Sequence, residues 1–171
     1  ISDQQYFTIA TLDAFTDLSK DSTTWNGSVS ADWAVAGNWS NGVPDSTRTA
    51  IIPGSASTMP DISALAQCFH IEIQSGATLS ISGSNTIEVY GSWINNGTFD
   101  ANTSHVFMRG GCGTAAISSA SNQVFYDLTI DKAFGVDLIS GNIDLLGSLT
   151  LTNGRFSTNN KGFTLMADAI D

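Results

Sequence analysis

The chain has 171 residues, of which 42% are hydrophobic and only 13% charged, so it can bury a continuous core and is not a disordered segment. Its 16 acidic and 6 basic residues give a net charge of −10, which argues against binding to a phosphate backbone. No apolar run approaches the ~20 residues that span a bilayer, so no transmembrane segment is expected.

The segment 1–67 differs in composition from the rest of the chain. Tyr6-Phe7-Thr8-Ile9 is predicted to form a strand, and the spacing of Leu12, Phe15 and Leu18 favours a short helix within 12–20. Three tryptophans follow, namely Trp25, Trp33 and Trp39. Buried, these rings would close the end of a solenoid, and this is the favoured interpretation. Exposed, they would form a candidate contact for glycans.

From position 68 onward, apolar and polar residues alternate in short runs. The pattern holds in Phe69–Gln74, Thr78–Ile81 and Ile87–Val89, and each run predicts a strand with one buried face. Ser75-Gly76 and Ser82-Gly83 separate the runs and are typical of tight turns.

The chain also resembles itself at a fixed distance. Ile87 matches Ile143 at an offset of 56, and Ile71 matches Leu128 at 57, so the segment 69–110 recurs as 126–167. At on the order of 20 residues for each β-helix coil, this period would hold about three coils. The predicted fold is therefore all-β, a parallel right-handed β-helix over 68–171 with a capping region over 1–67. An antiparallel β-sandwich is the alternative, because Asn-Gly between apolar strands also indicates hairpins.

A longer pattern resembles a known type of module. It comprises Trp25-Asn26-Gly27, Asn38-Trp39, Gly42-Val43-Pro44 and Ile52-Pro53, followed by runs such as Leu149-Thr-Leu-Thr-Asn-Gly154. The pattern is similar to modules of large secreted, adhesin-like surface proteins of the Bacteroidetes. This resemblance implies an extracellular location on the cell surface and a structural or adhesive role without catalysis. It also makes Ser22 and Ser46, which follow Asp21 and Asp45, candidate O-glycosylation sites, although polar turns are the simpler explanation of both motifs.

Residues that could carry chemistry are sparse. His70, Glu72 and Gln74 share one strand face, and Glu88 and Tyr90, with Arg109 as the nearest base, could line another in a polysaccharide-active β-helix enzyme. A solvated face is the simpler interpretation, so no catalytic residue is assigned. Calcium binding is compatible with the acidic composition, but no calcium-loop motif is present and no metal or cofactor site is assigned.

Cysteine content and surface character complete the expectations. Cys68 and Cys112 form a candidate disulfide in an oxidising compartment, but Cys68 could equally be a buried apolar residue. The expected partners are other copies of the chain or neighbouring modules, joined by strand addition, or glycans. A carbohydrate-binding module and a polysaccharide-active enzyme are the alternative functions.

Overall fold

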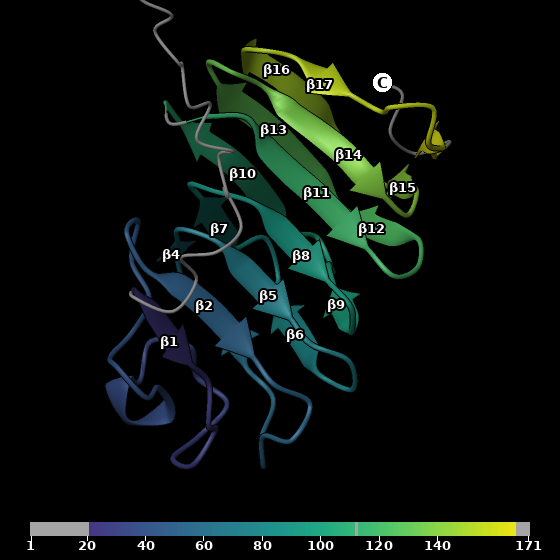
Figure 1. The fold of residues 1–171 in the computed structure, drawn as a ribbon. Coiled ribbons are helices and arrows are strands. Elements are labelled where there is room, and N and C mark those ends of the chain that lie inside the picture. Colours follow the sequence, from purple (N-terminus) through teal and green to yellow (C-terminus); the bar gives the residue numbers. More distant parts are fainter. Residues whose placement is uncertain (1–20, 112, 167–171) are drawn as a thin grey trace, which may run out of the picture.

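The chain folds into a parallel β-solenoid of about five coils (Figure 1), as the computed structural model of residues 21–111 and 113–166 shows. Every pairing between its named strands is parallel, which confirms the predicted solenoid and excludes the antiparallel sandwich. The predicted strand over 6–9 and the predicted helix within 12–20 lie outside the described residues.

Three sides of the solenoid are built from stacked short strands. The long sheet contains β1 (Ser22–Thr24), β2 (Thr49–Ile52), β5 (Ile71–Ile73), β8 (Trp93–Asn95), β11 (Ala115–Ser119), β14 (Val136–Ser140) and β17 (Phe156–Ser157). The five-stranded sheet contains β4 (Ala66–Cys68), β7 (Thr86–Val89), β10 (His105–Gly110), β13 (Asp127–Lys132) and β16 (Leu149–Asn153). The third side is divided between β3 (Asp61–Ile62), β6 (Thr78–Ile81) and β9 (Thr98–Asp100), and β12 (Gln123–Phe125), β15 (Ile143–Leu145) and β18 (Phe163–Leu165).

Each coil visits the three sides in the same order, beginning with β2, β3 and β4. From β2 onward, the step in sequence from a residue to its partner one coil later varies little, from a short step such as Ile87 to Val106 to a long one such as Trp93 to Ile117. These steps confirm the predicted coil length of roughly 20 residues. The described helical structure is one 3-10 turn, η1 (Ala36–Asn38), and no helix among these residues is long and apolar enough to cross a membrane.

The sequence repeat that relates 69–110 to 126–167 does not correspond to a whole number of coils. Ile71 lies in β5 of the long sheet, whereas its match Leu128 lies in β13 of the five-stranded sheet. Ile87 and Ile143 likewise lie on different sides, in β7 and β15. All three sides use the same unit, a short alternating strand followed by a polar or glycine corner, so similar segments recur strand by strand without returning to the same side.

The solenoid also begins earlier than the predicted boundary at position 68. β2 pairs with β5, and β4 pairs with β7, so the first complete coil already runs from Thr49 to Cys68. The capping region proper is the segment between β1 and β2. The boundary between this region and the first coil could not be predicted from the sequence, because Thr49–Ile52 is too short to show a clear alternation of apolar and polar residues.

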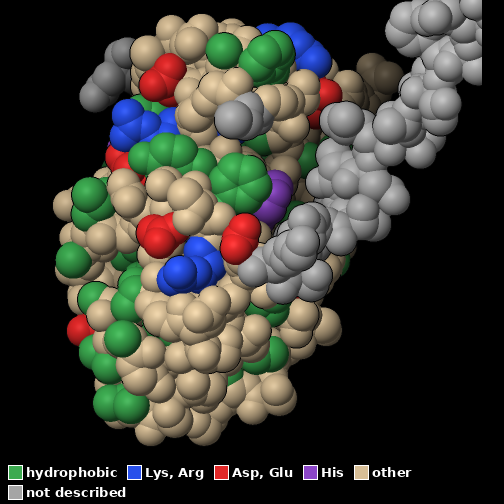
Figure 2. Space-filling model, turned by 60° about the vertical axis from the view of Figure 1, so that its left-hand side comes forward, with side chains coloured by type: hydrophobic (Ala, Val, Ile, Leu, Met, Phe, Trp, Pro, Cys, Tyr) green, Lys and Arg blue, Asp and Glu red, His purple; other side chains and the backbone are tan. Residues whose placement is uncertain are grey.

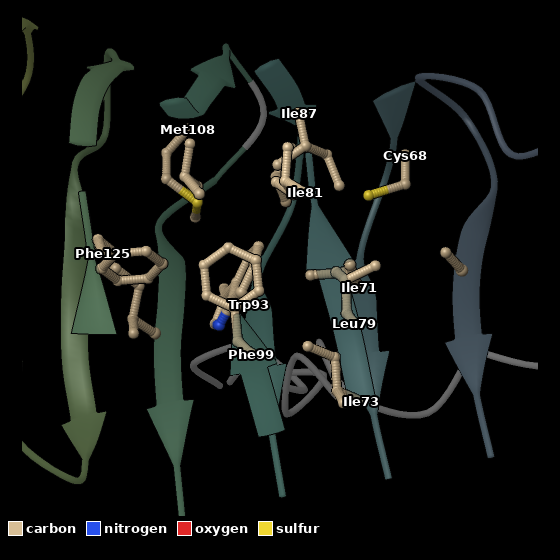
Figure 3. Close-up of a cluster of buried hydrophobic side chains, with 14 of the residues drawn as sticks. Cys68, Ile71, Ile73, Leu79, Ile81, Ile87, Trp93, Phe99, Met108 and Phe125 are labelled. Carbon is tan, nitrogen blue, oxygen red and sulfur yellow. The ribbon is translucent and has the colours of Figure 1, made fainter. Parts of the chain in front are cut away.

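The core consists of columns in which each inward side chain lies on its register partner one coil away (Figure 3). One column runs through Ala50, Ile71, Trp93, Ile117 and Leu138, all with none of their surface exposed. Burial of each large aliphatic or aromatic side chain contributes about 1.5–3 kcal/mol, so the columns are the main source of stability. Trp93 adds edge-to-face contacts with Phe99 and Phe125, at centroid distances of 4.7 and 5.3 Å.

Candidate functional site

The first end of the solenoid is closed by the three tryptophans. Trp25, Trp33 and Trp39 are only 1%, 3% and 4% exposed, and Trp39 makes edge-to-face contacts with both of the others. Trp25 Nε1 donates to the carbonyl of Thr58 at 2.6 Å, and Trp39 Nε1 donates to that of Trp33 at 2.8 Å. The favoured interpretation as a buried cap is confirmed. The glycan contact considered for these rings is wrong, because a ring buried in the core has no face free for a sugar.

The loop that carries these rings also covers the outer edge of β1. Thr24 accepts a backbone hydrogen bond from Ser40 and its own amide donates to the Ser40 hydroxyl, both at 2.9 Å. Asn38 is fully buried, and its side-chain oxygen accepts from the amides of Val29 and Ser30 while its amide group donates to the Asp32 carbonyl. This one asparagine therefore ties two parts of the loop to each other. We call this end the capped end.

The opposite end has no such cover among the described residues. Leu149 and Leu151 in β16 continue the columns of Leu128 and Ile130, and Phe163 and Leu165 in β18 continue those of Ile143 and Leu145. The four partners below are fully buried, yet Leu151 is 53% exposed and Leu165 is 47% exposed. We call this the open end, defined by Leu149, Leu151, Phe156, Phe163 and Leu165.

A polar cluster lies on the outer surface of the five-stranded sheet. Glu88 in β7 forms an ion pair with Arg109 in β10, and its other oxygen accepts from Gln67 Nε2 at 2.7 Å and from the Tyr90 hydroxyl at 3.2 Å. The strand register brings these side chains together, because β7 lies between β4 and β10. Glu88, Tyr90 and Arg109, which the sequence offered as a candidate set, lie together here. His70 lies in the corner before β5, Glu72 lies in β5 of the long sheet, and Gln74 follows that strand.

The electrostatics of this cluster do not suit acid catalysis. Burial alone would raise the pKa of Glu88, but hydrogen bonds from Gln67 and Arg109, the Arg109 charge and the Tyr90 hydroxyl together lower it below its ordinary value. A general acid in glycoside cleavage needs the opposite shift. Three donors also occupy the carboxylate, so Glu88 acts as a tie across three strands.

An open hollow of about 610 Å³ lies beside this tie and is lined by Leu65, Gln67, Glu88, Tyr90, Arg109, Gly110, Gly111, Asp131, Ala133 and Asn153. The Arg109 guanidinium lies 4.5 Å from the centroid of the Phe107 ring, and His105 stacks on the same ring at 5.6 Å. Both neighbours therefore restrict access to the aromatic surface. Charged groups on the face shown in Figure 2 form small groups of mixed sign, without a continuous field of one sign.

Lys132 was missed from the sequence, although its position in the alternation of Leu128, Ile130 and Lys132 places it on the inward face. Its side chain is fully buried, and Nζ donates to the carbonyls of Tyr90 at 2.7 Å and Arg109 at 3.1 Å. The ammonium thus joins the ends of β7 and β10 from inside, beneath the polar cluster. Its charge also contributes, after burial, to lowering the pKa of His70, whose Nδ1 accepts from the Ser92 amide at 2.8 Å.

The remaining candidate residues occupy structural positions. Cys68 is a fully buried free thiol whose pKa is raised by burial, so the structure does not contain the proposed disulfide, and Cys112 lies outside the described residues. Ser22 is part of β1, and Ser46 lies in a turn where Asp45 accepts from the Thr47 amide and hydroxyl. Within residues 21–111 and 113–166, no group of three or more His, Cys, Asp or Glu side chains is placed to hold a metal.

Taken together, these features define a class of protein: a parallel β-solenoid with one capped end and one open end. Residues 24–123 match the model of a family described as a domain of unknown function (DUF8693), and the chain belongs to this family. The matched segment runs from β1 through the tryptophan cap to the start of β12. No curated protein and no solved structure gives a significant match to the chain.

Proposed function

We propose that the chain is a structural or adhesive module of a bacterial cell-surface protein or fibre and has no catalytic role. The observation that carries this proposal is the open end, where side chains in core register remain exposed on β16 and β18. A stacked parallel solenoid extends by adding layers, so such an end suits a unit that continues into a neighbour. The opposite end is closed by the tryptophans, so the two ends of the unit differ.

The composition and the sequence pattern support the surface location. Charged residues make up only 13% of the chain, and short neutral side chains solvate much of it. The tryptophan, Gly-x-Pro and Ile-Pro pattern resembles modules of secreted Bacteroidetes surface proteins. The resemblance extends across the cap and the coils, which together form one continuous core.

Labelling of intact cells tests the location. Antibodies against the chain, detected by immunogold electron microscopy on unpermeabilised cells that produce it, should label the outer surface or extracellular filaments. A cytosolic protein of the same cells provides the control and should remain unlabelled. Label that appears only after permeabilisation would contradict the proposal.

A carbohydrate-binding role is the second candidate, and the hollow beside Glu88 and Arg109 favours it. This hollow offers a guanidinium, a phenol, a carboxamide and the carboxylate of Asp131, which are groups that hydrogen-bond to sugar hydroxyls. A glycan array with the wild type and Arg109→Ala tests it. Binding that is lost in Arg109→Ala would support this role, and an empty array or unchanged binding would remove it.

A further inference from the structure

The open end presents two kinds of unmet interaction. Its three outermost strands, β16, β17 and β18, are the last members of their sheets, so each has a backbone edge without a partner strand among the described residues. Five apolar side chains in core register lie between these edges. Two of them, Phe156 and Phe163, pack against each other with their ring centroids 5.5 Å apart. An added strand with alternating apolar residues would satisfy the edges and cover the side chains together.

The capped end of a second copy is not suited to this task. Its edge strand β1 is already hydrogen-bonded to the loop that contains Ser40, and the rings beneath it are at most 4% exposed. Direct stacking of one folded body on another would therefore leave the edge of β17, the open edge of the long sheet, unpaired. The partner has to supply an extended segment.

The sequence outside the described residues offers a candidate for such a segment. Residues 1–20 contain Tyr6-Phe7-Thr8-Ile9, in which Phe7 and Ile9 alternate with polar or amphipathic neighbours, and Leu12, Phe15 and Leu18 follow. This segment is as long as one coil, whose length is given by steps such as Ile87 to Val106.

Reach favours a neighbouring molecule over the chain's own segment. β1 and β17 are at opposite ends of the long sheet, six strand spacings apart, which is about 29 Å at ~4.8 Å for each spacing. The chain's own segment would use about nine residues to cover that distance, so only about eleven of its 20 residues would remain, fewer than one coil needs. In a neighbour stacked with its capped end on the open end, residue 21 would lie next to that end, and the whole segment would be available.

We infer that the open end is the acceptor for residues 1–20 of a second copy, with Phe7 and Ile9 continuing the columns that end at Leu151 and Leu165. This inference rests on the proposed function, because it describes how the module would join its neighbours. Assembly is then head to tail, each copy giving its N-terminal segment to the next. The complex is heterologous, so chains rather than closed dimers form.

Two double variants of the full chain separate donor from acceptor. Leu151→Lys with Leu165→Lys places charges on the open end, and Phe7→Asp with Ile9→Asp places charges on the segment. Each should weaken self-association by on the order of a hundredfold or more, since an unpaired charge is strongly unfavourable in an apolar interface. Ile139→Lys is the matched control, because Ile139 is 51% exposed on β14 and should leave association unchanged.

Sedimentation velocity over a range of concentrations provides the readout, with circular dichroism to show that each variant is folded. The wild type should form oligomers of increasing length, and each double variant alone should remain monomeric. A mixture of the two should form a one-to-one complex, because one retains its segment and the other its open end. That complementation is specific to a donor and an acceptor on different copies.

Other outcomes overturn the inference. Wild-type protein that stays monomeric would show that no second copy occupies the open end, and a segment variant that still dimerises would indicate that two open ends meet. A mixture that forms no complex would contradict the head-to-tail arrangement. Each of these results leaves the surface role intact, whereas label confined to the cell interior would overturn the proposed function whatever the state of assembly.

Discussion

The two ends of the solenoid handle the last layer of an apolar core in opposite ways. At the capped end, Trp25 and Trp39 fill the space over the first coil, and the loop held by Asn38 bonds to the edge of β1. At the open end, Leu151 and Leu165 occupy core register but remain about half exposed. The difference shows that closing a solenoid requires both bulky side chains and hydrogen bonds for the strand edge.

The largest expected effect breaks the cap. Trp25→Ala removes a side chain that is 1% exposed and leaves the Thr58 carbonyl without its indole donor. We expect a loss of about 3–5 kcal/mol in the free energy of unfolding, whereas Leu165→Ala at the open end should lose less than about 1 kcal/mol. Urea denaturation followed by circular dichroism measures both. Equal losses would mean that the two ends are equally packed.

A pair of register partners sharpens the comparison within one column. Ile130 is fully buried and Leu151, one coil above it, is 53% exposed. Ile130→Ala should lower the free energy of unfolding by about 2–5 kcal/mol and Leu151→Ala by less than about 1 kcal/mol. The measurement uses dilute protein, so that association does not contribute. A large loss for Leu151→Ala would show that the open end is covered within a single molecule.

Two glycines with the same backbone conformation separate packing from strain. Gly27 in the cap and Gly83 between β6 and β7 both have φ of +60°, but a Cβ on Gly27 would lie 2.2 Å from the Thr58 carbonyl oxygen, whereas Gly83 has open space. Gly83→Ala should therefore lose about 1 kcal/mol of stability, and Gly27→Ala about 3 kcal/mol. Thermal melts of the two variants test this. Similar melting temperatures would contradict a tightly packed cap.

The Glu88 tie offers a smaller effect away from both ends. Its pKa is lowered from 4.5, so its stabilising contribution is complete above about pH 4.5 and is lost as the pH falls through the folded-state pKa. Glu88→Gln should lower the free energy of unfolding by about 1 kcal/mol at neutral pH. The difference from wild type should shrink in acid. If the difference in the free energy of unfolding between Glu88→Gln and the wild type persisted at low pH, the charge of Glu88 would not be the source of its stabilising effect.

His70 should give the smallest effect. Burial and then the Lys132 charge lower its pKa from 6.5, so the unfolded chain takes up a proton first as the pH falls. Stability should therefore decline as the pH drops below 6.5 towards the folded-state pKa. His70→Asn keeps an acceptor for the Ser92 amide and should lack this slope. Denaturation curves between neutral and mildly acidic pH distinguish the two proteins.

Much of the strand pattern could be predicted from local alternation. The runs at Thr78–Ile81 and Ile87–Val89 are found as strands β6 and β7, and burial of the tryptophans followed from their grouping at one end. The three sides could not be distinguished, because their strands share one alternation and the lengths of the corners determine the side. For that reason the match between Ile71 and Leu128 did not reveal that the two residues lie in different sheets.

The polar cluster was predictable only in part. Alternation placed Glu88 and Tyr90 outward, and Arg109 was the nearest base in the sequence. The ion pair between Glu88 and Arg109 forms because β7 and β10 are neighbouring strands, and the local sequence pattern does not predict which strands are neighbours. The contributions of Phe107 and Lys132 could not be predicted from local pattern. Phe107 contributes through contacts of its ring with other side chains of β10. Lys132 is a charged residue at an inward position, against the usual preference of lysine for exposure.

Hydrogen–deuterium exchange of the full chain tests most directly whether the two ends differ and whether a neighbour covers the open one. In dilute solution, the amides of β16 and β18 should exchange rapidly while those of β2 and β5 stay protected. At high concentration, β16 and β18 should become protected as the N-terminal segment of another copy docks. Full protection of β16 and β18 in dilute protein would contradict the account, because the open end would then already be closed.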